Sequence, residues 1–538
     1  MSYRDTQPFR IPFDYSDEAN IRLSDQDIPI RNLSVQFRDE PGWVERATDR
    51  ESFKLWLLKQ IKQHIDTDDA KWNFTCTRED ITLILDELPF YKKYVREIRK
   101  RGFLMEPDHD GVWRMDGVLS EELRRDLVEA VTKLGDILNT EEEQEEELEP
   151  EKLGRGHDGG RDDNKDDDND DYENENKDNS SDYDNEDDAD EDGEDAECEP
   201  RLRDLLDPSK YPISYNETAC LEEGEFVKVT LMEWKYHAKK GLDRNFAWLP
   251  SEFKIAANGE TKIVSYINNL TLPGQDIIFN PILEKLFTRL VPMFNHVLAD
   301  IDCGTLGKER TDWPAWRWKP PMISPARSLE GKTLKVIVRM IQIDLIPGSP
   351  NYPGSDWHTA GMVNDQIVAT AIYNYANDNV SDWSIHFQHQ CFHPEEVLYS
   401  EERDWNGIQR IGPTRTRENR AIVFPNLLQY SFSDIDLRDK TKPGSAKMLV
   451  FHLCDPFSPF PTPSTRTIPP QQPGHYEFML RQTRLGKLPE DIFQMIMKYV
   501  TGTIFSAAKA KKYQKRITKE REEILRKDLS HRFESDSE

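Results

Sequence analysis

The chain has 538 residues, with 101 acidic against 71 basic side chains and a net charge of −30. Its six cysteines lie far apart without a Cys-x-x-Cys pair, which is typical of a reduced compartment and excludes a disulfide-rich secreted fold. No run of about 18 apolar residues and no N-terminal signal pattern occurs, so we expect a cytoplasmic or nuclear protein without a membrane partner. This length is enough for about three domains.

The residues before position 139 favour helices. Residues 1–40 are mixed polar with several prolines, and we expect an extended arm there. Apolar residues recur at helical spacing over 52–61, 78–98 and 120–138, with Thr77 as a candidate N-cap of the second segment. We interpret these stripes as core-packing faces and predict a small helical domain over residues 41–138.

The negative charge is concentrated in one segment. Residues 141–200 hold 31 acidic and 5 basic side chains, a net charge of −26, whereas the remainder carries −4. Such a sequence buries too little apolar surface to offset the entropy of ordering, so we expect residues 139–200 to form an acidic disordered insertion. A solvating spacer is the simpler interpretation, and an acidic arm for a basic protein is the alternative.

Residues 201–480 change to a β pattern. Runs rich in β-branched residues predict strands at 333–346, 367–375, 384–391, 420–424 and 447–453, with Pro and Gly between several of them. Many strands with turn signals point to a barrel or jelly roll. A helical pair over 280–298 is expected to cover the outside of the sheet.

Residues 481–538 return to helix, with predicted helices at 489–500 and 506–527. The second contains the basic stretch AKAKKYQKRITK, whose composition suits nucleic acid or the acidic insertion as a partner. We prefer a solvated helix face as its interpretation, so a nucleic-acid partner is not expected.

Several longer strings occur in a fixed order: FAWLP (246–250), SYINNL (265–270), WHTAGM (357–362), FPNLLQ (424–429), KPG (442–444) and IPPQQ (468–472). With them the chain resembles a large, mostly fungal family of unknown function over residues 30–138 and 201–525. That family is similar to the Fe(II)/2-oxoglutarate-dependent oxygenases. The resemblance implies an α+β protein whose core is a double-stranded β-helix (jelly-roll or cupin-like), with an N-terminal helical domain and C-terminal helices.

The resemblance also assigns a metal site, but most of its positions in this chain do not carry the ligand residues of that family. Such oxygenases show Trp-His-x-Glu-Gly, Leu-Gln-His and Gly-His-Arg, with two histidines and a carboxylate on iron and an arginine on 2-oxoglutarate. These roles fall on His358, Ala360, Tyr430 and Ala446, and only His358 is retained. Lys447 beside Ala446 points to the opposite strand face. The resemblance therefore implies a degenerate, metal-free member without a cofactor.

A rebuilt metal site is the alternative. Asp356 lies two residues before His358, so its carboxylate could share a face with the imidazole and, with another histidine, hold Fe(II) beside 2-oxoglutarate. The competing interpretation is a turn in which Asp356 caps its own backbone.

Two further groups of possible ligands remain open. His389, Cys391 and His393 alternate and are ligand types that zinc accepts, but a fourth ligand is lacking. His452 replaces an apolar residue in a predicted central strand, and we expect it to be buried and bonded to a backbone carbonyl.

Three hypotheses follow. The first is a non-catalytic binding or scaffold protein with a pocket around His358, Asn364 and Asn426. The second is an active Fe(II)/2-oxoglutarate-dependent oxygenase with a rearranged metal site. The third is an interaction protein that acts through its acidic insertion. The ligand, the partner and the oligomeric state do not follow from the sequence.

Overall fold

The computed structural model describes residues 8–9, 12, 27–47, 49, 51, 53–56, 58–59, 78–148, 201–231, 241–270, 275–303, 327–390, 408–458, 462–499 and 504–534. The chain divides into two compact units, Met1–Val131 with Pro200–Glu538, and Thr132–Glu199. Helix α5 (Glu121–Leu148) spans this division, and the other elements below belong to the first unit.

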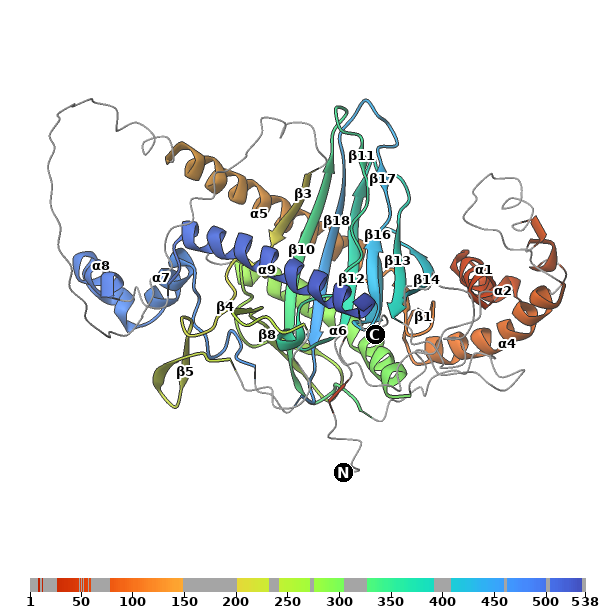
Figure 1. Ribbon diagram of the computed structural model, residues 1–538, viewed down its shortest axis with the longest axis horizontal. Coiled ribbons are helices and arrows are strands. Elements are labelled where there is room, and N and C mark those ends of the chain that lie inside the picture. Colours follow the sequence, from red (N-terminus) through yellow and green to blue (C-terminus); the bar gives the residue numbers. More distant parts are fainter. Residues whose placement is uncertain are drawn as a thin grey trace, which may run out of the picture. The chain divides into compact units, whose positions relative to one another are not determined.

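The first unit is built on a nine-stranded antiparallel sheet (Figure 1). Its order is β1 (Met105–Pro107), β2 (Trp113–Asp116), β15 (Arg420–Pro425), β12 (Ile367–Asp378), β18 (Gly444–Cys454), β10 (Thr333–Leu345), β8 (Ser251–Ile255) and β9 (Thr261–Ile263), and β3 (Arg201–Leu206) also pairs with β10. The predicted strands at 333–346, 367–375, 420–424 and 447–453 are confirmed by β10, β12, β15 and β18. The alternating and continuous apolar runs in these segments correctly predicted strands.

The register places a defined set of side chains on one face of this sheet. His452 lies opposite Ile337 on one side and Thr370 on the other, and Thr370 lies opposite Phe424. Arg339 lies two residues beyond Ile337 on β10. Because successive side chains alternate between faces, all five share one face, which we call the inner face.

A three-stranded sheet packs against the inner face. It consists of β14 (Ile408–Arg415), β13 (Ser384–Gln390) and β16 (Gln429–Phe432), in that order. The ring of Phe387 in β13 lies 4.9 Å from that of Phe424, and the ring of Tyr430 in β16 lies 5.1 Å from it. The predicted strand at 384–391 is confirmed by β13. The two sheets therefore enclose an aromatic layer between them.

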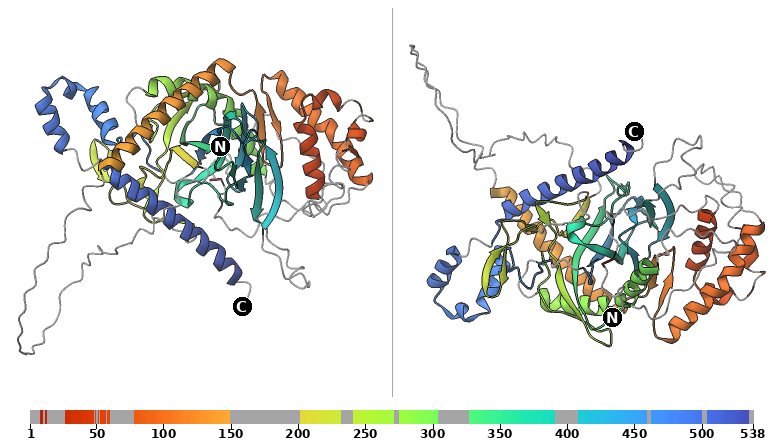
Figure 2. Two further views of the ribbon diagram at one scale, coloured as in Figure 1. Left: turned by 90° about the horizontal axis from the view of Figure 1, so that it is seen from above. Right: turned by 60° about the horizontal axis from the view of Figure 1, so that its bottom comes forward.

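Helix α6 (Gln275–Cys303), green in Figures 1 and 2, covers the other face of the large sheet. Its Phe287 ring lies 4.8 Å from Phe253 and 5.5 Å from Phe451. The predicted helical pair is wrong, because α6 continues through Pro281 and Pro292. A proline inside a helix costs about 3 kcal/mol. Burial of one large apolar side chain returns about 1.5–3 kcal/mol, and α6 buries many of them.

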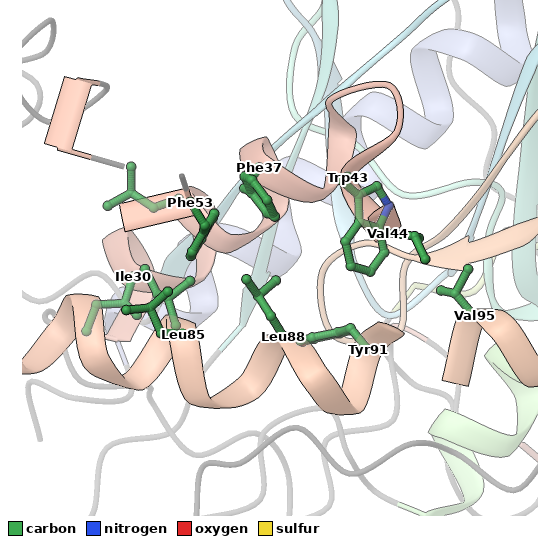
Figure 3. Packing of buried hydrophobic residues seen from close by; sticks show 11 residues of the cluster. Ile30, Phe37, Trp43, Val44, Phe53, Leu85, Leu88, Tyr91 and Val95 are labelled. Atoms are coloured by element: carbon green, nitrogen blue, oxygen red, sulfur yellow. The ribbon is translucent and has the colours of Figure 1, made fainter. Parts of the chain in front are cut away.

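The N-terminal part differs from the prediction in two places. Helix α1 (Asp27–Asp39) forms where an extended arm was expected, and its Phe37 joins α2 (Trp43–Arg46) and α4 (Arg78–Lys100) in a buried cluster (Figure 3). In addition, β1 and β2 extend the large sheet through pairing of β2 with β15. The segment 41–138, predicted as a helical domain, therefore also contains two short strands, which carry too few residues for a period to be recognised.

Helix α5 also runs further than expected. The predicted helix at 120–138 extends to Leu148, into the segment that we expected to be disordered. Glutamate is a good helix former, so the Glu-rich start of that segment prolongs the helix. Residues 149–200 lie outside the described residues.

Six short strands and three C-terminal helices complete the described part of the first unit. The strands pair as β4 (Ile213–Ser214) with β7 (Phe246–Ala247), β5 (Ala219–Glu222) with β6 (Glu225–Lys228), and β11 (Asn351–Tyr352) with β17 (Ile435–Asp436). The helices are α7 (Pro473–Arg481), α8 (Glu490–Tyr499) and α9 (Ala507–Glu534), and the last two confirm the predicted ones. Tyr513 and Ile517 of α9 pack in a cluster with Phe246. Among the described residues, no helix is long and apolar enough to cross a membrane.

Candidate functional site

His358 lies in the segment before β12, where this segment meets strand β16 of the three-stranded sheet. Its backbone forms a two-way bridge with Tyr430, with N–H to O distances of 3.2 and 3.0 Å. The half-buried imidazole ring lies 4.2 Å from the Tyr430 ring, centre to centre. Two of the positions that the sequence assigned to one metal site are therefore neighbours in space.

The imidazole of His358 has a fixed tautomer. Its Nδ1 lies 2.8 Å from the backbone oxygen of Asp356, and a carbonyl only accepts, so Nδ1 carries the hydrogen and Nε2 keeps a lone pair. Burial lowers the pKa of His358 to about 4, and the positive charge of Arg339 adds to this, while the bond to the carbonyl opposes it. The ring is therefore neutral near pH 7.

Ala360 lies among apolar side chains. It is buried in a cluster with Ile337, Ile367 and Cys454, so the position offers no charged group. Its backbone is held by Asn426, whose Oδ1 accepts from Ala360 N at 2.9 Å. The Nδ2 of Asn426 donates to the oxygens of Ala360 and Ile367 at 2.8 and 3.1 Å. Asn426 thus fixes the turn that follows His358.

Asn364 is also engaged in the fold. Its Nδ2 donates to the backbone oxygen of Phe246 at 2.6 Å and to the hydroxyl of Tyr215 at 3.0 Å. Its Oδ1 accepts from the backbone of Asp243 at 3.3 Å. These contacts assign Asn364 a structural task and leave its place in a ligand pocket a prediction.

Tyr430 is part of the aromatic layer. It is buried, and its ring lies 5.1 Å from Phe424 and 6.0 Å from Phe432. Burial raises the pKa of Tyr430 to about 12, although the charge of Arg339 opposes this rise. The phenol therefore stays protonated near neutrality and is a poor ligand for Fe(II).

Ala446 and Lys447 occupy opposite faces of β18, as predicted. Ala446 pairs with Ile343 and is fully buried, whereas Lys447 pairs with Gln342. No cationic fork is present at these two positions.

A cation that we did not predict, Arg339, projects from the inner face. It forms two parallel bonds with Asp204 of β3, from Nε to Oδ1 at 2.8 Å and from Nη2 to Oδ2 at 2.6 Å. The only sequence signal was an arginine inside the apolar run TLKVIVRMIQIDL. Because both prongs of the guanidinium are engaged, Arg339 is already paired within the protein.

His452 differs from its prediction. It is buried as expected, but its Nδ1 lies 3.0 Å from the hydroxyl of Thr370 and not near a backbone carbonyl. Its Nε2 has no hydrogen-bond partner among the described residues. Burial lowers the pKa of His452 to about 3, with further lowering by Arg339 and His358. The ring of Trp248 stacks on it at 5.8 Å with an interplanar angle of 29°.

The structure describes one imidazole, one buried alanine and one buried phenol at the three positions that the resemblance assigns to iron. Within the described ranges, no three His, Cys, Asp or Glu side chains are grouped to hold a metal ion. Asp356 is exposed and meets His358 through its backbone oxygen. His389 is buried near Gln409, with Nε2 to Oε1 at 3.3 Å, whereas Cys391 and His393 lie outside the described residues.

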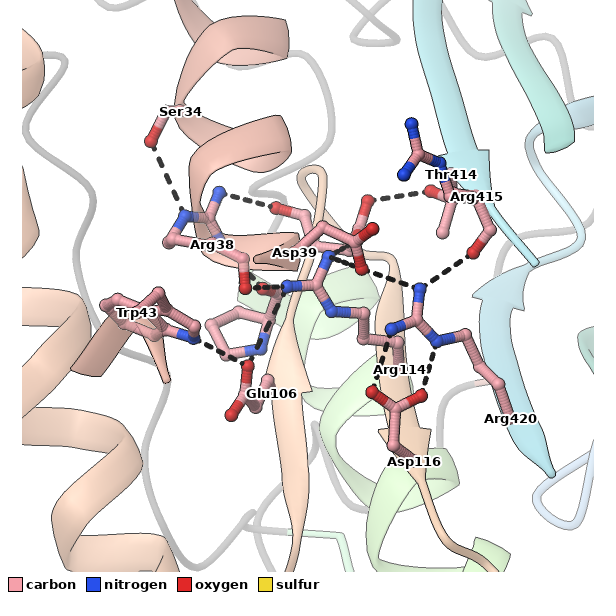
Figure 4. A network of polar contacts seen from close by, with 12 residues as sticks. Ser34, Arg38, Asp39, Trp43, Glu106, Arg114, Asp116, Thr414, Arg415 and Arg420 are labelled. Carbon is pink, nitrogen blue, oxygen red and sulfur yellow. Dashed lines mark hydrogen bonds and ion pairs between the residues drawn. The ribbon is translucent and has the colours of Figure 1, made fainter. Parts of the chain in front are cut away.

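A second polar region, which sequence reasoning missed, joins α1 to the large sheet (Figure 4). Arg420 of β15 bonds Asp116 with two nitrogens and Asp39 with a third, and Arg114 of β2 pairs with Asp108. Arg420 and Arg114 are almost fully buried. A cavity of about 270 Å³ adjoins this charged network. The signal was again an arginine next to an apolar strand run.

Comparison with known proteins supports one assignment. The family described as "Protein of unknown function (DUF4246)" matches residues 177–322 and 314–477, which together make up more than half of the chain. The chain belongs to this family. The match leaves out residues 30–138 and 478–525, which we had included in the resemblance. No curated protein matched the chain.

Three solved structures are similar at low scores. A bsmA homolog from Methylobium petroleophilum PM1 is 12% identical over 43% of this chain and 78% of its own, with a TM-score of 0.23. The Fe(II)/(alpha)ketoglutarate-dependent dioxygenase TqaL is 12% identical over 41% and 71%, also at 0.23. A 2OG-Fe(II) oxygenase family oxidoreductase from Burkholderia pseudomallei is 10% identical over 45% and 73%, at 0.17. All three TM-scores are below 0.5.

Proposed function

We propose that this DUF4246 protein is a metal-free, non-catalytic member of an oxygenase-like fold and acts as a binding or scaffold protein. One observation carries the proposal: the ring of Tyr430 lies 4.2 Å from His358, at the position where the resemblance assigns a second histidine ligand. A protonated phenol packed between Phe424 and Phe432 serves the aromatic layer and not a metal.

The other assigned positions support the same conclusion. Ala360 belongs to an apolar cluster, so the position of the carboxylate ligand is filled by packing. Ala446 is buried in the sheet, and Arg339 is held by Asp204. Replacing an ionised ligand by a packed apolar group removes the cost of burying a charge, and such a change stabilises the fold without a metal.

A rearranged oxygenase site is the second candidate, because one observation favours it. Histidines that bind metals usually donate their other ring N–H to a carbonyl or carboxylate. His358 does this through Nδ1 and is neutral, so Nε2 is free to bind. In this alternative, Asp356 and a further histidine would supply the missing ligands, and Fe(II) would supply the oxygen chemistry.

Anaerobic purification with Fe(II) separates the two candidates. We expect substoichiometric iron and no 2-oxoglutarate-dependent release of succinate above that of the His358→Ala variant. The variant Asp356→Asn tests the alternative ligand. The variant Asp434→Asn is its matched control, because Asp434 is an exposed aspartate in the connection that follows β16. Stoichiometric iron with turnover that both His358→Ala and Asp356→Asn abolish, but Asp434→Asn does not, would contradict the metal-free proposal.

A further inference from the structure

The C-terminal helix reaches the turn that follows His358. Arg521 of α9 has a side chain that is 8% exposed, and its Nε lies 3.1 Å from Oδ2 of Asp243. Its Nη2 lies 3.0 Å from Oδ2 of Asp365, and the guanidinium carbon lies 4.6 Å from the centre of the Trp248 ring. Burial raises the pKa of Asp243, and the charge of Arg521 opposes this rise. One arginine thus stabilises two buried carboxylates and an indole.

Asp365 fixes the turn between His358 and β12. Its Oδ2 accepts from Met362 N and its Oδ1 accepts from Trp248 N, both at 2.7 Å. Gly361 has a φ of +66°, and a Cβ there would lie 2.7 Å from Oδ2 of Asp365. The turn therefore packs so closely on this carboxylate that movement of Asp365 would move the turn.

Trp248 connects this arrangement to the inner face. It packs on the apolar cluster that contains Ala360, and its ring stacks on His452. Its ring also contacts the guanidinium of Arg521, and its Nε1 donates to the hydroxyl of Ser209 at 3.1 Å. Trp248 therefore covers both Ala360 and His452, and α9 holds Trp248.

We propose that α9 is a strap that closes the inner face, with Arg521 as the positioning residue: it holds Asp365 and Trp248, and release of α9 uncovers His452. The proposal depends on the proposed function only in taking the inner face as the binding site. His452 Nε2 is one of the buried polar atoms of the described residues that have no hydrogen-bond partner. Because Arg339 is paired with Asp204, the ligand class that the opened site fits is a small neutral molecule that hydrogen-bonds an imidazole.

Chemical modification of histidines in the full chain tests the strap. Diethyl pyrocarbonate carbethoxylates accessible imidazoles, and peptide mass spectrometry locates each adduct. We expect His452 to be protected in the native protein and to react about tenfold faster in Arg521→Ala, since local opening becomes more frequent. His296 of α6 is an internal control, because it is also buried with an unpartnered Nε2 but lies on the other side of the large sheet.

Two variants keep the test decisive. Lys519→Ala removes a positive charge from an exposed position of the same helix and should leave His452 protected. Arg521→Lys retains the charge but not the two-pronged reach, so it should fold and give an intermediate rate at His452.

Two outcomes would overturn the strap. If His452 and His296 become reactive together, Arg521 serves global stability alone, and if neither rate changes, α9 does not cover the site. Iron content and succinate release of the unmodified protein test the proposed function separately, because protection of His452 does not depend on either.

Discussion

The two ends of strand β15 differ in the side chains around them: those at one end are aromatic and apolar, and those at the other are charged. At Phe424 the inner face is aromatic, with Tyr430 and His358 packed beside it and alanine where the resemblance assigns a carboxylate. At Arg420, four residues earlier on the same face, the structure concentrates buried ions that join β15 to α1 and β2. In the first region, apolar and aromatic side chains occupy positions to which the resemblance assigns metal ligands. The second keeps its charges, because each one has a fixed partner.

The ionic network predicts the largest loss of stability. The variant Arg420→Ala removes the partner of Asp116, which is 57% exposed, and one partner of Asp39, which is 10% exposed and keeps its ion pair with Arg417. Removal of one member of a buried pair costs about 3–5 kcal/mol, and the Arg420–Asp39 pair is the more buried one. Urea unfolding measures this change. Arg415→Ala, an exposed arginine near the end of β14, should change the free energy of unfolding by less than about 0.5 kcal/mol. Equal effects of the two variants would contradict a special task of the network.

Restoring the assigned ligands tests the aromatic region. The double variant Ala360→Glu/Tyr430→His should gain Fe(II) binding at His358 if the frame of the site is intact. At an Fe(II) concentration 100 times the Kd, binding would raise the free energy of unfolding by about 2.7 kcal/mol. Each single variant is a control that lacks one ligand. A folded double variant that gains no iron-dependent stability would show that the positions do not converge on one metal.

The half-buried His358 and the buried His452 predict an acid-sensitive aromatic region. His358 and His452 have pKa values lowered to about 4 and about 3, below the value of about 6.5 for an unfolded histidine. Between these values the unfolded state binds more protons than the folded state, so stability is present above pH 6.5 and is lost as the pH falls. The slope is at most about 1.4 kcal/mol per pH unit for each histidine. Unfolding of His452→Gln from pH 7 to pH 4 should show a shallower loss, and an unchanged slope would contradict it.

The acidic segment predicts the smallest effect on stability. Residues 141–200 carry most of the net charge, yet sequence alone gives them no buried partner. Deletion of residues 149–200 should change the free energy of unfolding by no more than about 0.5 kcal/mol, so the Tm should stay nearly the same. If the segment acts as an arm, the deletion should abolish capture of a basic protein partner. A large fall in Tm would mean instead that this segment folds against the rest of the chain.

Local pattern determined much of the fold, and the metal positions followed only from the resemblance. The strands around β10, β12 and β18 were predictable because their periodicity is set by neighbouring residues. The proximity of His358 to Tyr430 was predictable because matching strings assign both to one site. The faces of Ala446 and Lys447 followed from strand alternation.

Tertiary structure alone decided the rest. The pairing of Arg339 with Asp204, the attachment of β2 to β15 and the reach of Arg521 to Asp365 join residues far apart in the chain. No local period records which cation meets which carboxylate, because such pairs depend on the whole packing. By itself the sequence therefore determined which residue types stand at the assigned positions. The structure decided which side chains pack around them.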